Sequence, residues 1–270
     1  MEVATEVATP EHVRAALEAG IDYLWIGARS SATPIVIQSL ADSILDLRFK
    51  IGDLKGVLIK NPVNADAALW IGNIERLTQT GVPVMAVHRG CNHQPCWKMA
   101  HAVRLARPDI PLLLDPSHMS GDAAKVPELL QKATELGFDG AMVEVHCKPS
   151  EALSDAKQQI SPDGLAEIIP FGGVSSPNDE ERKDTELNWL RAEIDELDET
   201  LWDTIAARMD VSKRIGEWKK AHGIAPLQPE RFAEISEKLK VKSEELGLSE
   251  EFMMSVWEKI HEESLKQQVK

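Results

Sequence analysis

Five short apolar runs recur in the first 170 residues, and this repeat constrains the fold more than any other feature of the sequence. The runs are YLWIGAR (23–29), GVLIKNP (56–62), VMAVHRG (84–90), LLLDPSH (112–118) and GAMVEVH (140–146). The last four begin at residues 56, 84, 112 and 140, a spacing close to one strand plus one helix of a (β/α)8 barrel. Continuous apolar runs are typical of parallel strands covered on both faces. Residues 1–170 are therefore predicted to form an α/β domain, a partial (β/α)8 TIM-type barrel.

The number of runs is too small for a closed barrel, which has eight strands. Five strands are clear, and the TEV at residues 5–7 is a candidate for the end of another. At about 31 residues per strand–helix unit, we expect on the order of 80 residues of the barrel to be missing ahead of Met1. Five parallel strands alone would leave two open edges, which favour aggregation. The barrel half is therefore predicted to lack its first strands.

The sequence pattern changes after residue 170. Residues 171–186, FGGVSSPNDEERKDTE, are rich in Gly, Ser, Pro and charge, which is typical of a linker. Beyond it, apolar side chains follow three- and four-residue steps at Leu187, Leu190, Ile194, Leu197, Leu201, Ile205 and Met209. Apart from Gly216, no breaker precedes Gly223, so the pattern predicts one helix of roughly 35 residues, about 50 Å long. Two shorter helices are predicted at about 229–245 and 250–268, separated by Gly247, with Ser249 as an N-cap.

The long helix presents more apolar surface than two short helices can cover from end to end. An intertwined homodimer through the long helix is the simplest way to bury this stripe. Residues 187–270 are therefore predicted to form an all-α, three-helix domain that dimerises. A monomeric three-helix bundle with a projecting end is the alternative.

Composition excludes several classes of partner. With 30 basic and 44 acidic side chains the net charge is −14, so nucleic acid and anionic membrane surfaces are not expected partners. Three cysteines are too few and too irregular for a disulfide framework. No apolar run approaches the roughly 18 residues of a membrane span, and the N-terminus is acidic rather than signal-like. A reduced, cytoplasmic location is expected.

Three cations follow consecutive predicted strands, namely Arg29, Lys60 and Arg89. The carboxyl ends of barrel strands open onto one site, so these side chains are expected to converge on one pocket. Such a trio suits a small substrate that carries phosphate and carboxylate groups.

The later strand ends carry His118 and Glu144, and Asp155 follows in SDAKQQ. Together these residues give a nitrogen and oxygen ligand set for a divalent metal such as Mn, Fe, Co or Zn.

The motifs WIGAR, LIKNPVN, HRG, DPSH, MVEVH and LSDAKQQ, over about residues 4–165, resemble the 3-deoxy-7-phosphoheptulonate synthases, which catalyse the first step of the shikimate pathway. The resemblance implies metal-assisted condensation of phosphoenolpyruvate with erythrose 4-phosphate. It implies that Arg29, Lys60 and Arg89 bind phosphoenolpyruvate. It also implies that the metal, bound by His118, Glu144 and Asp155, polarises the aldehyde.

The chain departs from this family at two motifs. A GPCS-like motif, which supplies a cysteine ligand to the metal, and a KPRT-like motif, which helps to hold both substrates, belong to the stretch that the chain lacks. Cys91, directly after HRG, is a conceivable replacement for the missing thiolate. A catalytically inactive synthase fragment therefore stands as an alternative for this half.

The helical half carries polar groups on all three predicted helices. The long helix contains Arg191, Arg208 and Lys219 among its apolar positions, and buried cations are costly unless an anion meets them. Arg231 opens the second helix, and the third places two hydrogen-bonding groups on one face, Ser264 and Gln268. No acid, base or nucleophile stands out, which suits a reaction that needs a shaped cationic pocket and no proton transfer.

Residues 186–268 resemble the all-helical chorismate mutases through LRAEIDELDETLWDTIAARMDVSKRIGEWK, LQPER and EESLKQQ. These enzymes rearrange chorismate to prephenate by selecting a reactive conformer and stabilising charge on its ether oxygen. The resemblance implies that Arg208 and Arg191 bind the two carboxylates, with Arg191 supplied by the partner subunit. It also implies that Lys219 and Gln268 hydrogen-bond the ether oxygen, and that Arg231 and Ser264 bind the ring hydroxyl and carboxylate regions.

Two positions depart from the better-known bacterial mutases. Gln228, in the chorismate-binding region, stands where an Asp is usual, and Phe232 stands where a Glu contacts the ring hydroxyl. The second change is expected to weaken recognition of the hydroxyl.

The order of the two halves is similar to that of bifunctional shikimate-pathway enzymes of aromatic amino acid biosynthesis. Feedback on the barrel by prephenate or chorismate bound at the helical end is a hypothesis from this fusion order. Two alternatives stay open: a monofunctional mutase with an inactive barrel remnant, and a non-catalytic dimerisation module that binds aromatic acids.

Overall fold

The computed structural model describes residues 2–51, 54–168 and 179–269. The chain divides into two compact units, Met1–Glu196 and Leu197–Lys270, and each is described by itself. Among the described residues, no helix combines the length and the apolar character that a membrane crossing requires.

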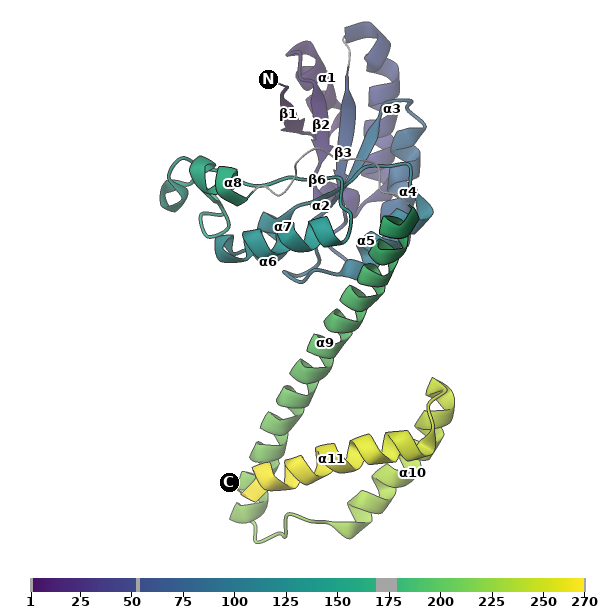
Figure 1. The fold of residues 1–270 in the computed structure, drawn as a ribbon, viewed down its shortest axis with the longest axis vertical. Coiled ribbons are helices and arrows are strands. Elements are labelled where there is room, and N and C mark those ends of the chain that lie inside the picture. The colour runs from purple at the N-terminus through teal and green to yellow at the C-terminus, as the bar shows by residue number, and fades with distance from the viewer. Residues whose placement is uncertain (1, 52–53, 169–178, 270) are drawn as a thin grey trace. The chain divides into compact units, whose positions relative to one another are not determined.

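The first unit is built on a six-stranded parallel sheet in which every strand pairs with the next one along the chain (Figure 1). The strands are β1 (Ala4–Glu6), β2 (Tyr23–Ile26), β3 (Gly56–Lys60), β4 (Val84–His88), β5 (Leu112–Leu114) and β6 (Gly140–Ala141). This sequential parallel order is that of a partial (β/α)8 barrel, so the predicted fold class is confirmed. The sheet has one strand more than the five clear apolar runs, because Ala4–Glu6 pairs with β2.

Helices connect the strands of the first unit. They are α1 (Pro10–Glu18), α2 (Ala28–Ser31), α3 (Pro34–Ile51), α4 (Ala67–Thr78), α5 (Trp97–Ala106), α6 (Pro116–Ser120), α7 (Val126–Glu135) and α8 (Pro162–Ile168), with single 3-10 turns η1 (Ala123–Lys125) and η2 (Pro149–Glu151). The helices α3, α4 and α5 pack against one another in succession, as the outer layer of a barrel does. The core lies between these helices and the sheet, where Leu24, Ile59 and Leu114 are fully buried.

The last strand is shorter than its apolar run predicts. The run GAMVEVH covers residues 140–146, but β6 ends at Ala141. In the described sheet β6 has a single neighbour, β5, and Val145 instead forms an isolated parallel bridge with Ile160. Glu144 therefore lies in a loop beyond the strand and not at its end.

Three long helices carry the rest of the described chain, as the sequence predicts. They are α9 (Asp179–Ala221), α10 (Pro229–Leu246) and α11 (Glu250–Val269). Ser249 caps α11 as expected, because its Oγ accepts a hydrogen bond from the backbone N–H of Phe252 at 3.2 Å. Gly247 ends α10 with a left-handed φ of 66°, which glycine adopts without steric cost.

The long helix α9 has 43 residues, which is more than the predicted length of roughly 35. It begins at Asp179, so residues 179–186 of the predicted linker are helical. Residues 171–178 of that linker lie outside the described residues. The first unit includes α9 as far as Glu196, and the second begins at Leu197.

The first part of α9 packs against the first unit through one of its faces. Trp189 is 1% exposed, and its indole stacks on the imidazole of His101 with ring centroids 5.4 Å apart. Beside this stack, Glu193 Oε1 lies 2.6 Å from His101 Nδ1. Glu196 accepts a hydrogen bond of 2.8 Å from the backbone N–H of Trp97, at the start of α5. This carboxylate therefore serves a helix terminus whose own N-cap residue makes no side-chain hydrogen bond.

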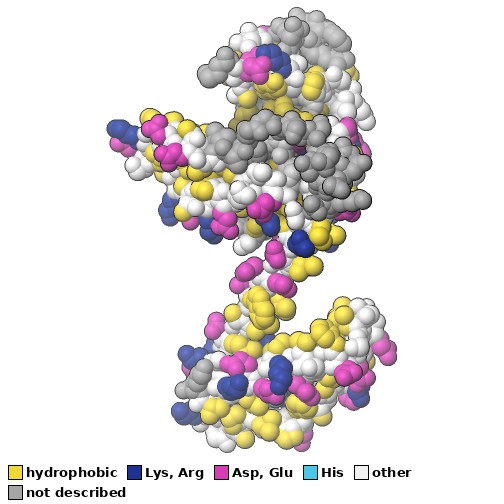
Figure 2. Space-filling model, viewed as in Figure 1, with side chains coloured by type: hydrophobic (Ala, Val, Ile, Leu, Met, Phe, Trp, Pro, Cys, Tyr) yellow, Lys and Arg dark blue, Asp and Glu magenta, His cyan; other side chains and the backbone are white. Residues whose placement is uncertain are grey.

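Between these contacts, most apolar side chains of the predicted stripe on α9 are exposed to solvent. Exposed large hydrophobic residues of α9 are Leu187, Leu190, Ile194, Leu197, Leu201, Trp202, Val211, Ile215 and Trp218. Hydrophobic side chains also gather on the face of the helical unit seen in Figure 2. One chain therefore leaves much of the stripe of α9 uncovered.

The helices α9 and α11 approach closely at Gly216. A Cβ atom at this glycine would lie 2.4 Å from the carbonyl oxygen of Gln268 and 2.5 Å from its Cα. Real Cβ atoms do not come so near to backbone, so any side chain at position 216 must displace α11.

We expect Gly216→Ala to lower the free energy of unfolding by about 1–3 kcal/mol, because the added methyl group overpacks the α9–α11 crossing. Urea unfolding followed by circular dichroism measures this loss. Gly72→Ala, inside α4, is the matched control, since its Cβ would meet only the flexible end of Arg76 at 3.4 Å. That substitution is expected to be neutral or to stabilise by up to about 1 kcal/mol. Equal effects of the two substitutions would contradict the close approach.

Candidate functional site

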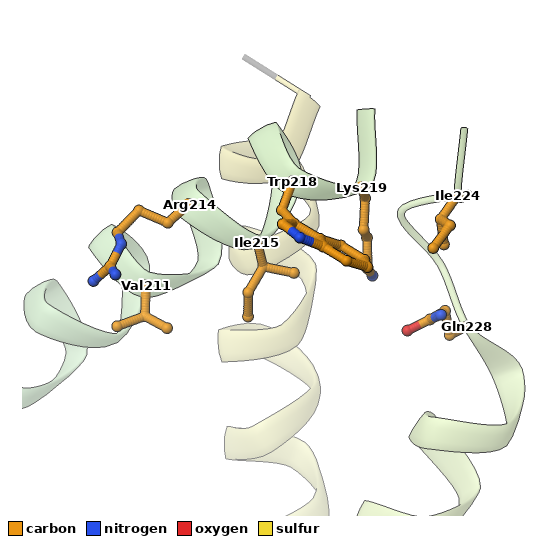
Figure 3. A pocket seen from close by; sticks show the side chains of 7 residues that line it. All are labelled: Val211, Arg214, Ile215, Trp218, Lys219, Ile224 and Gln228. Atoms are coloured by element: carbon orange, nitrogen blue, oxygen red, sulfur yellow. The ribbon is translucent and has the colours of Figure 1, made fainter. Parts of the chain in front are cut away.

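A cavity of about 420 Å³ opens in the helical unit (Figure 3). Its lining residues are Val211, Arg214, Ile215, Trp218, Lys219, Ile224 and Gln228. The volume lies in the range of small-molecule sites, and the lining contains two cations and no carboxylate. Two residues assigned to the mutase site from the sequence, Lys219 and Gln228, are thus in its wall.

Lys219 and Gln268 meet across the α9–α11 crossing. The Nζ of Lys219 donates hydrogen bonds to Gln268 Oε1 at 3.2 Å and to the carbonyl oxygen of Pro226 at 2.6 Å. Because Gln268 accepts through its carbonyl oxygen, its amide N–H groups are left to donate elsewhere. The residue Lys219 is 9% exposed, and its ammonium group has no carboxylate partner among the described residues.

Arg208 and Ser264 form a second pair on the same two helices. The Nη1 of Arg208 donates to the hydroxyl of Ser264 and to the carbonyl oxygen of Ile260, the latter at 3.5 Å. Burial lowers the pKa of the Arg208 guanidinium below its ordinary value. No carboxylate in the described part of the chain pairs with this guanidinium. The unit therefore holds two half-buried or buried cations that have no counter-charge among the residues the structure describes.

The remaining assigned residues of the helical half lie apart from these pairs. Arg231 is exposed on α10 and forms a surface ion pair with Glu234 at 2.5 Å. Phe232, the neighbouring position, packs against Trp257 with ring centroids 4.6 Å apart. Arg191 is exposed on the part of α9 that belongs to the first unit.

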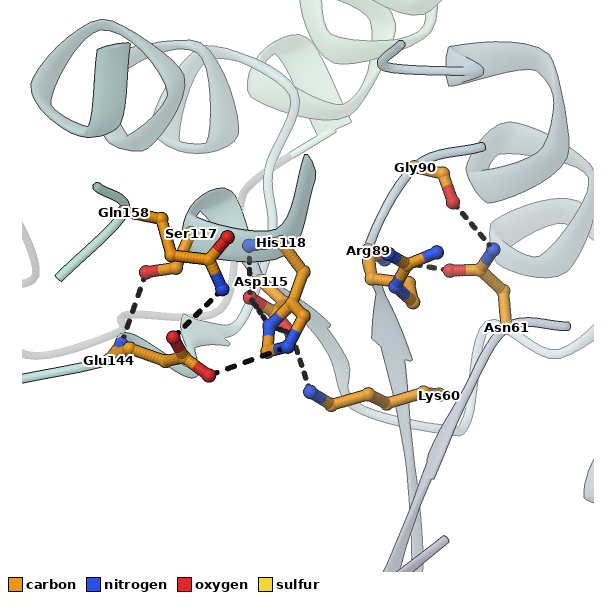
Figure 4. A network of polar contacts seen from close by, with 9 residues as sticks. All are labelled: Lys60, Asn61, Arg89, Gly90, Asp115, Ser117, His118, Glu144 and Gln158. Atoms are coloured by element: carbon orange, nitrogen blue, oxygen red, sulfur yellow. Dashed lines mark hydrogen bonds and ion pairs between the residues drawn. The ribbon is translucent and has the colours of Figure 1, made fainter. Parts of the chain in front are cut away.

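In the first unit, Lys60 and Asp115 form a buried ion pair between the ends of β3 and β5, which lie on either side of β4 (Figure 4). The Nζ of Lys60 lies 2.7 Å from Asp115 Oδ2, and the two side chains are 5% and 1% exposed. The sequence places them there because Lys60 is the last residue of β3 and Asp115 follows β5 as the N-cap of α6. The ammonium group also lies 4.7 Å from the centroid of the Trp25 ring.

Asp115 positions His118 as well. Its carboxylate accepts the backbone N–H of His118 at 3.1 Å and lies 2.9 Å from the imidazole Nδ1. Burial alone would raise the pKa of Asp115, but the hydrogen bond from His118 and the charge of Lys60 outweigh it and hold the pKa below its usual range. The carboxylate therefore stays ionised. Because it contacts Nδ1, the other imidazole nitrogen of His118, Nε2, points away from Asp115.

Nε2 of His118 faces a carboxylate. It lies 3.4 Å from Glu144 Oε1, while Glu144 Oε2 accepts a hydrogen bond from Gln158 at 2.8 Å. The backbone N–H of Glu144 donates to the hydroxyl of Ser117 at 3.1 Å. These contacts fix Glu144 although it lies beyond the end of β6.

One ligand atom each of His118, Glu144 and Asp155 lies within 4.8 Å of the other two. An imidazole nitrogen and two carboxylate oxygens are donors that suit a divalent transition metal. The three residues predicted as metal ligands are therefore brought together, and their chemistry fits such an ion. Cys91 is buried elsewhere, 3.9 Å from the amide of Asn61, and is not part of this cluster in the described chain.

The three predicted phosphoenolpyruvate ligands have different environments. Arg89 follows β4 and is held by Asn61, whose Oδ1 accepts its backbone N–H at 2.7 Å and whose Nδ2 donates to the carbonyl oxygen of Gly90 at 3.0 Å. Lys60 belongs to the group of contacts around Asp115, whereas Arg89 belongs to a separate group around Asn61, which follows Lys60 in the chain (Figure 4). Arg29 lies on α2, is exposed, and makes no hydrogen bond or ion pair with the described residues.

The sequence did not single out three residues that position this network: Asn61, Ser117 and Gln158. Each lies within three residues of a predicted site residue: Asn61 follows Lys60 in LIKN, Ser117 precedes His118 in DPSH, and Gln158 follows Asp155 in SDAKQQ. A neutral amide or hydroxyl has no signature of its own in a single sequence, because such groups are also common in solvated loops.

We expect Asp115→Ala to lower the free energy of unfolding by about 3–5 kcal/mol, because it leaves the Lys60 ammonium buried without a counter-charge. Chemical denaturation of the whole protein measures the loss. Asp109→Ala is the matched control, since Asp109 pairs with Arg107 at 2.7 Å on the surface and is 63% exposed. The control is expected to cost at most about 1 kcal/mol. A loss for Asp115→Ala no larger than that of the control would contradict the role of the buried pair.

Comparison with known proteins divides the chain at nearly the same place as the sequence does. Residues 1–173 match the model of the DAHP synthetase I family, and residues 190–269 match chorismate mutase type II. A 4-amino-4-deoxychorismate mutase from Streptomyces venezuelae is 37% identical over 75 residues, which cover 28% of this chain and 73% of that protein. A phospho-2-dehydro-3-deoxyheptonate aldolase from Thermotoga maritima is 40% identical over 60 residues, 22% of this chain and 18% of the relative.

Solved structures agree with the first of these matches. The crystal structure of the Thermotoga maritima aldolase (DAHP synthase) has a TM-score of 0.53 at 26% identity and covers 62% of this chain. A truncated form of the same organism's 3-deoxy-D-arabino-heptulosonate 7-phosphate synthase has a TM-score of 0.51 at 25% identity. The chain spans 48% and 63% of these two solved chains. The chain therefore belongs to the DAHP synthetase I family over residues 1–173 and carries a chorismate mutase type II domain over residues 190–269.

Proposed function

We propose that the helical unit rearranges chorismate to prephenate as a chorismate mutase. The observation that carries this proposal is the pair of cations, Arg208 and Lys219. Both face hydrogen-bonding partners on α11, and neither has a counter-charge in the described part of the chain. Chorismate is a dianion, so its carboxylates would supply the missing charges. Uncompensated cations in a small cavity favour such a ligand over a neutral one.

The reaction breaks a carbon–oxygen bond and forms a carbon–carbon bond within one molecule, without proton transfer. Its barrier falls when the extended substrate is held in a compact, chair-like conformation. Arg208, oriented by Ser264, would grip a carboxylate and hold that conformation. The Lys219 ammonium and the free amide N–H of Gln268 would donate to the ether oxygen, where negative charge develops as the bond breaks. The close α9–α11 contact at Gly216 would keep these two donors together.

The proposed mutase is a homodimer in which Arg191 enters the partner subunit's site. One face of the first part of α9 is buried against its own unit at Trp189 and Ala192. Leu190, Arg191 and Ile194 are exposed, as is the apolar stripe that continues along the helix. A second copy of α9 would cover that stripe and receive Arg191, as the intertwined arrangement requires.

This arrangement predicts complementation between two inactive variants. Arg191→Ala and Lys219→Ala are each expected to lower chorismate turnover by about 100-fold or more. In a heterodimer of the two, one site carries both changes and the other carries neither. Co-expression of the differently tagged chains is therefore expected to restore about a quarter of wild-type turnover, from random pairing in a two-fold dimer.

The matched control pairs Lys219→Ala with Gln268→Ala, whose residues contact each other within one chain at 3.2 Å. Every site of that heterodimer carries one change, so no activity is expected to return. Restoration in the control, or its absence with Arg191→Ala, would exclude a site that is shared in this way.

For the first unit the proposed activity is condensation of phosphoenolpyruvate with erythrose 4-phosphate. Lys60, Arg89 and Arg29 would bind the phosphate and carboxylate of phosphoenolpyruvate. His118, Glu144 and Asp155 would hold a divalent metal, whose chemistry is to polarise the aldehyde of the second substrate. Asp115 would keep His118 in the tautomer that presents Nε2 to the metal.

Metal binding gives a direct test of this assignment. Wild-type protein is expected to bind Mn²⁺ with a dissociation constant at least about tenfold lower than that of His118→Ala, because that substitution removes one of three ligands. Titration followed by electron paramagnetic resonance of free Mn²⁺ measures both. His12→Ala, at an exposed histidine on α1, is the control and is expected to bind as wild type does. Equal binding by all three proteins would remove the metal site from the proposal.

Two further proposals follow from the presence of both units in one chain. A protein with both activities would act at the entry to aromatic biosynthesis and at the branch toward phenylalanine and tyrosine. Prephenate or chorismate bound by the helical unit would then inhibit the condensation. The second candidate is a mutase whose first unit does not catalyse condensation. Loss of phosphoenolpyruvate in the presence of erythrose 4-phosphate and Mn²⁺ distinguishes the two.

The ring substituent of the mutase substrate has two candidates. Chorismate carries a hydroxyl group at ring carbon 4. Two curated relatives, from Streptomyces venezuelae and Streptomyces pristinaespiralis, are named 4-amino-4-deoxychorismate mutases, at 37% and 31% identity. The amino compound is therefore the second candidate substrate of the same site.

A further inference from the structure

His261 lies on the face of α11 that carries the proposed mutase site. It precedes Ser264 by three residues and Gln268 by seven, and it follows Trp257 by four. These steps place all four side chains on one stripe of the helix. Because Ser264 and Gln268 contact Arg208 and Lys219, the imidazole belongs to the same surface.

The imidazole ring is fixed by aromatic neighbours. It stacks on Trp257 with ring centroids 5.0 Å apart and an interplanar angle of 16°. Phe232 of α10 meets its edge, with ring centroids 5.4 Å apart. A ring held on two sides loses little further freedom when it binds a ligand, so its nitrogen is preorganised.

Nε2 of His261 is buried and has no hydrogen-bond partner among the described residues. A buried nitrogen without a partner costs free energy, and native proteins keep few such groups. The cost is offset when a ligand supplies the missing hydrogen bond. This nitrogen lies in the same unit as Arg208 and Lys219. An anionic ligand that pairs with these two cations would also supply the hydrogen bond that the nitrogen lacks.

The charge state of the ring suits a neutral hydrogen-bonding group. Burial lowers the pKa of His261, and the charges of Arg208 and Lys219 lower it further. The imidazole is therefore neutral near pH 7, with one nitrogen that donates and one that accepts. A hydroxyl group matches either nitrogen, because it both donates and accepts.

A ring ammonium would fit this surface poorly. Arg208 and Lys219 repel a positive charge, and no carboxylate among the described residues pairs with either of them. By the resemblance noted for the sequence, Phe232 stands where a Glu would contact the ring hydroxyl. The imidazole of His261 lies against the Phe232 ring across the α10–α11 contact.

We infer that His261 recognises the ring hydroxyl of chorismate from α11, and that it makes the site select a hydroxyl over an ammonium group at ring carbon 4. This inference rests on the proposed mutase function. It assigns to the chain a specificity-determining residue on the third helix, in place of a carboxylate on the second. It also chooses chorismate over the amino compound for which the two Streptomyces relatives are named.

The test compares kcat/KM for chorismate and for 4-amino-4-deoxychorismate in the full-length protein. Wild type is expected to prefer chorismate by at least about tenfold, the value of one hydrogen bond to a substrate hydroxyl. His261→Leu is expected to lower kcat/KM for chorismate about tenfold, and to change it less than about twofold for the amino compound. The preference ratio is independent of the fraction of folded enzyme, so a loss of stability does not move it.

Two controls accompany this comparison. His261→Gln keeps a donor and an acceptor and is expected to retain most of the wild-type ratio. His12→Leu, at an exposed histidine of the first unit, is expected to leave both rates unchanged. An unchanged ratio in His261→Leu, or a wild-type preference for the amino compound, would overturn the role of His261 alone. If the wild type turned over neither compound, the proposed function would fall and this inference with it.

Discussion

The helix α9 runs through both units, and this continuity is the constraint that the two units share. The first part of α9 buries Trp189 against the first unit, and Glu196 completes the hydrogen bonding at the start of α5. The alternate positions, such as Leu190 and Ile194, are exposed and continue into the stripe of the helical unit. The boundary between the units at Glu196 and Leu197 therefore lies inside a helix, and not in a loop.

Periodicity explains which parts of the fold could be predicted. Runs spaced by 28 residues from residue 56 identified the parallel strands, and three- and four-residue steps identified the helices, because both patterns record which side chains are buried. The end of β6 could not be predicted, since whether Met142 to Val145 pair depends on a neighbouring strand and not on their own sequence. The helical start at Asp179 was also missed, because a polar, charged segment has no apolar period to read.

The parts of the candidate sites that could be predicted are the charged and metal-ligating side chains, because their residue types alone indicate their chemistry. His118, Glu144 and Asp155 lie close together as expected, although Glu144 lies in a loop beyond β6 and His118 lies on α6. Asn61 and Gln158 carried no such signal, although each supplies a hydrogen bond that fixes a charged neighbour. The partner of a charged group is set by three-dimensional contact, which composition and spacing do not record.

The continuity of α9 also limits how the length of this chain can vary. Each inserted residue turns everything that follows it by about 100°, whereas seven residues complete nearly two turns. A single insertion between Leu197 and Leu201 would place the apolar positions before and after it on different faces. Related chains are therefore expected to differ in this part of the helix by substitution or by steps near seven residues. The number of residues along α9, and not only their chemistry, therefore decides which positions share a face.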